Sequence, residues 1–126
     1  MDSEIYKENI LEHGEFPRNF KILKGYSVKA KETNPFCGDE MKVYLKIKNN
    51  KINDLSFINK GCIISTASAS LLTEDIKGKA IKSVLKMNAQ DILKLIKIEL
   101  SPNRIKCAEL VLMTIRKALN KYEENN

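Results

Sequence analysis

The chain of 126 residues suits one domain of ordinary size, and its 43% of hydrophobic residues are enough to form a core. The formal net charge of +6 comes with lysines spread along the sequence without interleaved aromatic residues, so we expect no nucleic-acid partner. No apolar run has the length of a membrane span, and the acidic residues 1–4 do not resemble a secretory signal, so we expect no membrane partner. Three cysteines, an odd number, argue against a disulfide framework and predict a reducing, cytoplasmic setting.

A helix is expected at the start of the chain. Either residue at positions 2–3 can cap it, and three residues spaced four and three apart share one face: Tyr6, Ile10 and His13. Gly14 fits its end, and Pro17 cannot continue it. His13 is the only histidine, and we favour a helix-end histidine bonded to a nearby backbone group over a metal ligand.

An antiparallel sheet of about three strands should follow. Residues 21–31 alternate weakly and predict an edge strand. Residues 39–48 alternate clearly, with Met41, Val43, Leu45 and Ile47 on one face and Tyr44 among lysines on the other, which predicts a half-buried strand. Residues 48–51 predict a hairpin turn, because asparagine tolerates the positive φ of such turns, and residues 52–58 return as the partner strand.

Helices are expected in the second half. Four segments have helical spacing: residues 63–76 with a core of small residues, about 80–86, 91–100 behind an Asn88 cap, and about 105–122. Ser101-Pro102 is interpreted as the break before the last helix. We therefore predict a single α+β domain over residues 1–126, with the sheet packed against about four to five helices.

The three cysteines stand at predicted element boundaries. Asp39 lies two residues after Cys37 at the start of a strand, where extended backbone directs both side chains to the same side, and Gly38 leaves room for a metal. Cys62 and Cys107 are each expected to open a helix, where the dipole and free N–H groups favour the thiolate. The pattern predicts a metal site made of Cys37, Asp39, Cys62 and Cys107.

Three thiolates and one carboxylate suit tetrahedral zinc, or an iron–sulfur cluster with one oxygen ligand. The carboxylate is the harder ligand and should hold a soft cluster less tightly, which suits a site that releases its cluster. The alternative is that the cysteines are small buried apolar residues. Three cysteines at boundaries, one of them beside Gly38-Asp39, favour the metal site.

These residues also resemble a known family over nearly the whole chain, the U-type iron–sulfur cluster assembly scaffolds (IscU, SufU and the N-terminal domain of NifU). The matching motifs are Pro17-Arg18-Asn19 after the first helix, Cys37-Gly38-Asp39, Gly61-Cys62 with its Ser/Ala-rich helix and Thr73-Glu74, Lys77-Gly78-Lys79, and Cys107. The resemblance implies a SufE/IscU-like fold and a scaffold on which a [2Fe–2S] cluster is built. Iron and sulfur from a cysteine desulfurase would supply the cluster, which then passes to apo iron–sulfur proteins.

The resemblance also implies roles for individual residues. Cys37, Cys62 and Cys107 would be cluster ligands, and Asp39 would assist assembly and release or bind zinc. Isc-type members carry histidine at the position of Lys106, so the lysine here resembles the Suf or Nif branch. The short segment 62–107, however, lacks the insertion typical of SufU. Residues 100–104 do not reproduce the Isc chaperone motif Leu-Pro-Pro-Val-Lys, which argues against dependence on that chaperone.

Two functions remain open from the sequence. The first is the cluster scaffold. The second is a zinc-dependent sulfurtransferase, in which zinc occupies the site until a desulfurase frees one thiolate to accept sulfane sulfur. In either case Cys107, which has basic neighbours, and Asp39 are expected to act directly in the chemistry. A cysteine hydrolase would need a histidine base, and nothing in the sequence ties His13 to a cysteine.

Overall fold

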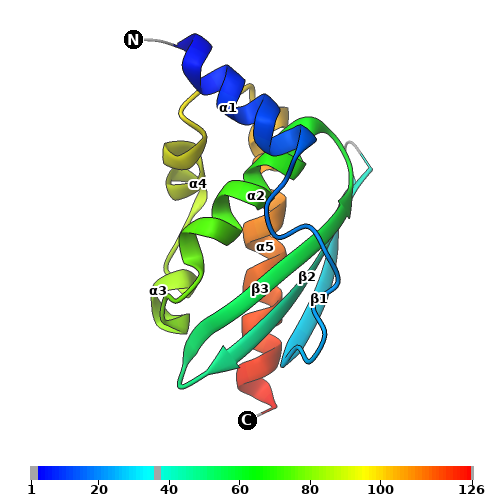
Figure 1. Cartoon of the computed structure of the whole chain (residues 1–126), viewed down its shortest axis with the longest axis vertical. Coiled ribbons are helices and arrows are strands. Elements are labelled where there is room, and N and C mark those ends of the chain that lie inside the picture. The colour runs from blue at the N-terminus through cyan, green and yellow to red at the C-terminus, as the bar shows by residue number, and fades with distance from the viewer. Residues whose placement is uncertain (1–2, 36–37, 126) are drawn as a thin grey trace.

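The computed structural model of the protein describes residues 3–35 and 38–125. Its elements are α1 Ser3–Glu15, β1 Val28–Asn34, β2 Asp39–Lys48, β3 Lys51–Lys60, α2 Ile63–Ile76, α3 Ile81–Leu85, α4 Ala89–Ile96 and α5 Pro102–Glu124. The three strands form one antiparallel sheet in the order β1-β2-β3, and the helices gather on one side of it (Figure 1). The predicted α+β class, with three strands and five helices, is confirmed.

The β2–β3 hairpin forms as the alternation predicts. Met41, Val43 and Leu45 of β2 are completely buried on the inner face of the sheet. Asn49 and Asn50 join the strands with φ of 54° and 60°, the left-handed values of a two-residue hairpin turn. Because antiparallel pairing continues to Glu40 and Lys60, the start of β2 and the end of β3 lie side by side.

The core lies between the sheet and the two longest helices. α5 packs against β1 and β2, α2 lies beside α5 and next to β3, and α1 crosses over α2 (Figure 1). Ala67 and Ala69 of α2 are completely buried, and their small side chains let this helix pack closely. No helix within residues 3–35 and 38–125 is long and apolar enough to span a membrane.

The predicted edge strand over residues 21–31 is wrong in its first half. Only Val28–Asn34 pairs with β2, while the preceding residues cross the outer face from the edge of β3 to the edge of β1. Phe20 forms an isolated parallel bridge with Phe57, and the Tyr26 ring packs on Tyr44 with 5.4 Å between centroids. Tyr44, predicted to face solvent, is therefore only 3% exposed.

The helix ends follow their capping residues. The predicted Asn88 cap is confirmed: its side chain accepts a hydrogen bond from Gln90 N, and Asp91 completes a capping box. That helix ends at Ile96, earlier than predicted, because Lys97 adopts a left-handed φ of 63°. The predicted break before the last helix is confirmed, but α5 begins at Pro102 and not near residue 105, with Ser101 as the N-cap and proline at the first helical position.

Two lysines of α5 cover the free edge of the sheet. Lys117 Nζ donates to the Lys31 carbonyl at 3.0 Å, and Lys121 Nζ donates to the Lys29 carbonyl at 3.4 Å. These carbonyls point away from β2, and unpaired edges of this kind are templates for pairing with another chain. The lysines therefore shield β1.

Replacing both shielding lysines, Lys117→Ala/Lys121→Ala, should promote self-association through β1, because it exposes carbonyls that a second strand can bind. Sedimentation velocity over a range of concentrations would detect a species that grows with concentration. The matched control is Lys82→Ala/Lys86→Ala, which removes the same charge from two exposed lysines elsewhere. Equal behaviour of the two double variants would contradict a shielding role.

Candidate functional site

Asp39, Cys62 and Cys107 come together at one end of the sheet. Their ligand atoms, a carboxylate oxygen and two sulfurs, all lie within 4.8 Å of one another. Asp39 and Cys107 are buried at 3% and 4% exposure, whereas Cys62 is partly exposed. Cys37, the fourth predicted ligand, lies outside the described residues. The structure thus assembles three of the four predicted residues from three separate elements.

The contact between Asp39 and Cys62 follows from the hairpin register. Asp39 begins β2, and Cys62 follows the end of β3, which pairs with the start of β2. Cys62 is the N-cap of α2; its backbone N–H donates to Asp39 Oδ1 at 3.2 Å, and its thiol donates to Asp39 Oδ2 at 3.6 Å. The carboxylate therefore satisfies a backbone donor at the helix N-terminus as well as facing the thiol.

Gly61 makes this close approach possible. A Cβ at position 61 would lie 2.6 Å from Asp39 Oδ1 and 2.8 Å from Ser65 Oγ, distances shorter than van der Waals contact. A side chain here would push the carboxylate away from Cys62. In the sequence Gly61 is only part of a motif, and its steric role follows from the contact between Asp39 and Cys62.

Cys107 does not open a helix, contrary to the prediction. α5 begins at Pro102, so Cys107 lies in the second turn, on the buried face. Asn34, the last residue of β1, places its side-chain amide nitrogen 4.0 Å from Cys107 Sγ. The thiol is therefore positioned by the packing of α5 on the sheet and by this amide, not by the helix N-terminus.

The three donor atoms fit a soft metal. Zinc–sulfur bonds of about 2.3 Å and zinc–oxygen bonds of about 2.0–2.2 Å place tetrahedral ligands roughly 3.5–3.8 Å apart, within the spacing of this cluster. Two sulfurs and one oxygen also match the donor types of iron–sulfur sites. A fourth donor would complete a tetrahedron, and Cys37 stands two residues before Asp39 in the sequence.

Comparison with known proteins shows the family of the chain. Residues 5–126 match the NifU-like N terminal domain. The chain belongs to this family. It is 36% identical over 127 residues to Iron sulfur cluster assembly protein 1 of Trachipleistophora hominis, covering 96% of this chain and 88% of the relative. It is 33% identical over 139 residues to the zinc-dependent sulfurtransferase SufU of Bacillus subtilis, covering 97% and 94%.

A solved structure shares the fold of this NifU-like domain. A scaffold protein for the SUF system from Fervidobacterium islandicum superposes with a TM-score of 0.78 at 26% identity. The superposition covers 94% of this chain and 99% of the other. The predicted relation to U-type iron–sulfur cluster assembly scaffolds is confirmed.

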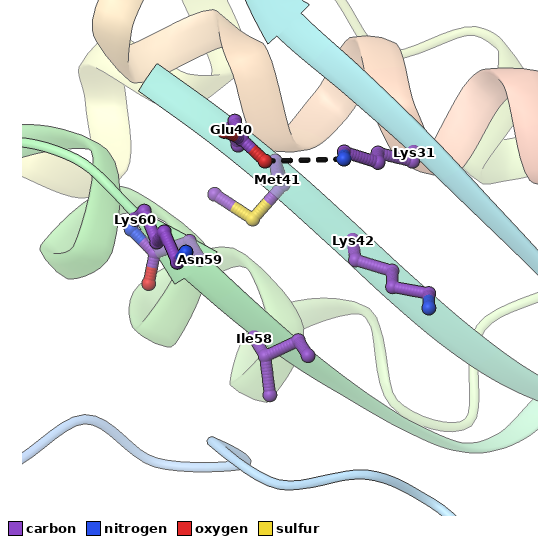
Figure 2. A pocket seen from close by; sticks show the side chains of 7 residues that line it. All are labelled: Lys31, Glu40, Met41, Lys42, Ile58, Asn59 and Lys60. Carbon is purple, nitrogen blue, oxygen red and sulfur yellow. Dashed lines mark ion pairs between the residues drawn. The ribbon is translucent and has the colours of Figure 1, made fainter. Parts of the chain in front are cut away.

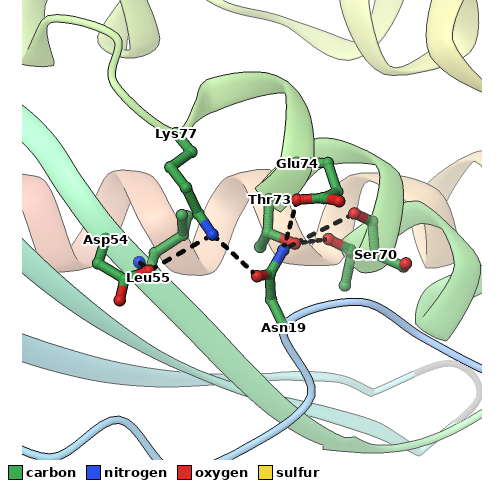
Figure 3. A network of polar contacts seen from close by, with 8 residues as sticks. Asn19, Asp54, Leu55, Ser70, Thr73, Glu74 and Lys77 are labelled. Carbon is green, nitrogen blue, oxygen red and sulfur yellow. Dashed lines mark hydrogen bonds and ion pairs between the residues drawn. The ribbon is translucent and has the colours of Figure 1, made fainter.

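The NifU-like domain also contains a polar network that sequence analysis did not foresee. Asn19, at a left-handed φ of 63°, donates from its amide to Thr73 Oγ1 at 3.0 Å and to Glu74 Oε2 at 3.3 Å (Figure 3). Lys77 donates to Asn19 Oδ1 at 3.2 Å and lies 3.5 Å from Asp54 Oδ1. Three motifs that are separate in the sequence thus contact one another and fix the loop after α1 to α2. They contain Asn19, Thr73-Glu74 and Lys77.

His13 belongs to the same junction and not to the metal cluster. Its Nδ1 lies 2.6 Å from Ser70 Oγ, which also accepts a hydrogen bond from the Arg18 backbone N–H at 2.8 Å. The partner is thus a side chain of α2, not a nearby backbone group as predicted. His13 is absent from the group of ligand atoms found among the described residues.

Burial lowers the pKa of His13 below its ordinary value of 6.5, the Arg18 guanidinium lowers it further, and the carboxylates of Glu12 and Glu74 oppose the shift. The unfolded chain therefore binds more protons than the folded chain as the pH falls below 6.5. We expect the free energy of unfolding to decrease from pH 7.5 to pH 5.5. Urea titrations at both values would measure it.

The control for this pH dependence is His13→Gln, which removes the only histidine of the chain. The variant should lose most of the difference between the two pH values, because most carboxylates titrate below this window. An unchanged difference would show that another group is responsible.

A hollow of about 220 Å³ lies on the outer face of the sheet, beside the end that carries the site. Figure 2 shows its lining residues: Lys31, Glu40, Met41, Lys42, Ile58, Asn59 and Lys60. Glu40 is the only carboxylate among them, there is no cysteine or histidine, and the Glu40 carboxylate pairs with Lys31 Nζ at 3.1 Å. The cysteines and carboxylate that could hold a metal thus lie in the Asp39–Cys62–Cys107 cluster, and this hollow is a largely basic surface next to it.

Proposed function

We propose that this NifU-like domain is a scaffold for iron–sulfur cluster assembly. The convergence of Asp39 Oδ, Cys62 Sγ and Cys107 Sγ within 4.8 Å carries the proposal, because it supplies soft donors and one exchangeable oxygen. Iron and a cysteine desulfurase would supply the cluster, a [2Fe–2S] cluster with Cys37 as a further ligand, and apo iron–sulfur proteins would receive it. A cytoplasmic location stays a prediction.

The burial of the donor residues supports a site that holds a cluster temporarily and then releases it. Cys107 and Asp39 are shielded by the sheet and α5, while Cys62 remains partly exposed at the N-terminus of α2. An exposed ligand gives incoming iron, sulfur and acceptor proteins access. The two buried ligands keep part of the site away from solvent.

The second candidate is a zinc-dependent sulfurtransferase, as the Bacillus relative is named. Here a thiolate released from zinc would attack the outer sulfur of a desulfurase persulfide, and the desulfurase thiolate would leave. Alignment lengths favour the scaffold. The alignment with SufU runs to 139 positions and that with the Trachipleistophora protein to 127, at nearly equal coverage of this chain, so SufU has more residues without a counterpart here.

Anaerobic reconstitution separates the two functions. Protein stripped of zinc receives ferrous iron, cysteine and a desulfurase, and visible absorption and transfer to an apo-ferredoxin are followed. A cluster that forms and is transferred establishes the scaffold. Failure to form a cluster, together with increased desulfurase turnover by the zinc-loaded protein, would establish the sulfurtransferase instead.

A further inference from the structure

Asn34 connects the parts of the site that lie far apart in the sequence. Its side chain is buried, with 6% exposure, and its amide nitrogen reaches Cys107 Sγ on α5. Its backbone carbonyl accepts a hydrogen bond from Gly38 N at 2.8 Å, and its partner in the β1–β2 register is Asp39. One residue therefore contacts one proposed ligand directly, pairs with a second, and accepts a backbone hydrogen bond from Gly38.

We propose that Asn34 is a positioning residue that holds the Cys107 sulfur in place as a metal and cluster ligand. The proposal rests on the proposed function of the site. An amide donor is uncharged and cannot itself replace a thiolate as ligand, so it acts through Cys107. Hydrogen bonds to a coordinated sulfur orient it and withdraw electron density from it.

The distance between Asn34 and Cys107 suits a hydrogen bond that forms fully when the Cys107 sulfur binds a metal. The distance of 4.0 Å from nitrogen to sulfur is long for a neutral thiol. Hydrogen bonds to ionised groups are shorter and stronger, so the contact should tighten when the sulfur is a metal-bound thiolate. Partners of this type typically account for about 10–100-fold in metal affinity.

The test is zinc affinity, measured by competition with a chromophoric chelator on Asn34→Ala and Asn34→Leu. Both variants remove the amide. Alanine leaves a cavity and leucine fills the space, so at least one of the two should fold. We expect zinc affinity to fall about 10–100-fold in each folded variant. In the cobalt-loaded proteins the thiolate-to-metal charge-transfer band should shift, a change that lowered stability alone does not produce.

Asn59→Ala is the matched control. Asn59 is an asparagine near the end of β3 whose amide donates to Thr66 Oγ1 at 2.8 Å and to Ser65 Oγ at 3.3 Å. It should lower thermal stability but leave zinc affinity and the cobalt band nearly unchanged. Wild-type affinity and an unshifted band in either Asn34 variant would overturn the proposal.

The outcome is independent of the cluster experiment. Zinc and cobalt binding require neither iron nor a desulfurase. If reconstitution fails while the Asn34 variants still lose metal affinity, the scaffold function fails and the positioning role stands. If clusters form and transfer while the Asn34 variants bind zinc normally, the scaffold function stands and the positioning role of Asn34 fails.

Discussion

Serine in place of Cys107 should remove most of the affinity of the chain for zinc and its ability to retain an assembled cluster. Cys107 Sγ is one of three donors within 4.8 Å, and its burial leaves little room for another ligand. Four-ligand structural zinc sites bind with about 10–16 kcal/mol, so one thiolate represents roughly 3 kcal/mol, or more than about a hundredfold in affinity. The hydroxyl of serine is a far poorer ligand.

Chelator competition and metal analysis of the purified variant would measure this loss. Because serine has the same shape as cysteine and is slightly smaller, the fold should persist. Thr114→Ser is the matched control: it trims a buried methyl group of the same helix, while its hydroxyl can still donate to the Leu110 carbonyl as Thr114 does at 2.7 Å. Cys62→Ser and Cys37→Ser should behave like Cys107→Ser. Full zinc occupancy in any of the three would remove that cysteine from the ligand set.

The local elements could be predicted where the sequence carries a strong period or cap. β2 and α2 have the predicted bounds, because alternation from Asp39 and helical spacing from Ile63 are unbroken. The prediction failed where tertiary packing decides. Residues 21–27 form no strand: Lys21 N donates to the Phe57 carbonyl of β3, Ser27 N donates to the Leu45 carbonyl of β2, and the residues between them cross the outer face of the sheet. The last helix begins at Pro102, three residues before the predicted start, because Ser101 supplies its cap.

The grouping of Asp39, Cys62 and Cys107 could be predicted from residue types, but the contacts that support it could not. Asp39, Cys62 and Cys107 stand out because thiols and carboxylates at element ends are few. Asn34 has no sequence signal that ties it to the site, since its contact with Cys107 spans 73 positions. The partner of His13 is likewise 57 positions away, and spacing along one element carries no information about such pairs. A serine-rich helix offers several equivalent hydroxyls, and only packing selects Ser70.

Alanine in place of Asp39 should slow cluster release more than it weakens the fold. Transfer begins when an incoming thiolate displaces an existing ligand, and the hard carboxylate among soft thiolates should exchange first. Without it the cluster would be held by the cysteines alone. An increase of about 1.4 kcal/mol in the activation free energy of ligand exchange would slow transfer about tenfold.

The same substitution also removes the acceptor for the Cys62 backbone N–H at the start of α2. Loss of such a cap costs about 1 kcal/mol, which lowers the midpoint of thermal unfolding by several degrees in a domain of this size. Asp39→Asn separates the two effects, because its amide oxygen can still accept from Cys62 N while the anionic ligand is gone. We expect near wild-type stability but slow transfer to apo-ferredoxin for Asp39→Asn, and both defects for Asp39→Ala. If both variants transfer as fast as the wild type, Asp39 is not the ligand that opens the site, and its buried carboxylate serves only to cap α2.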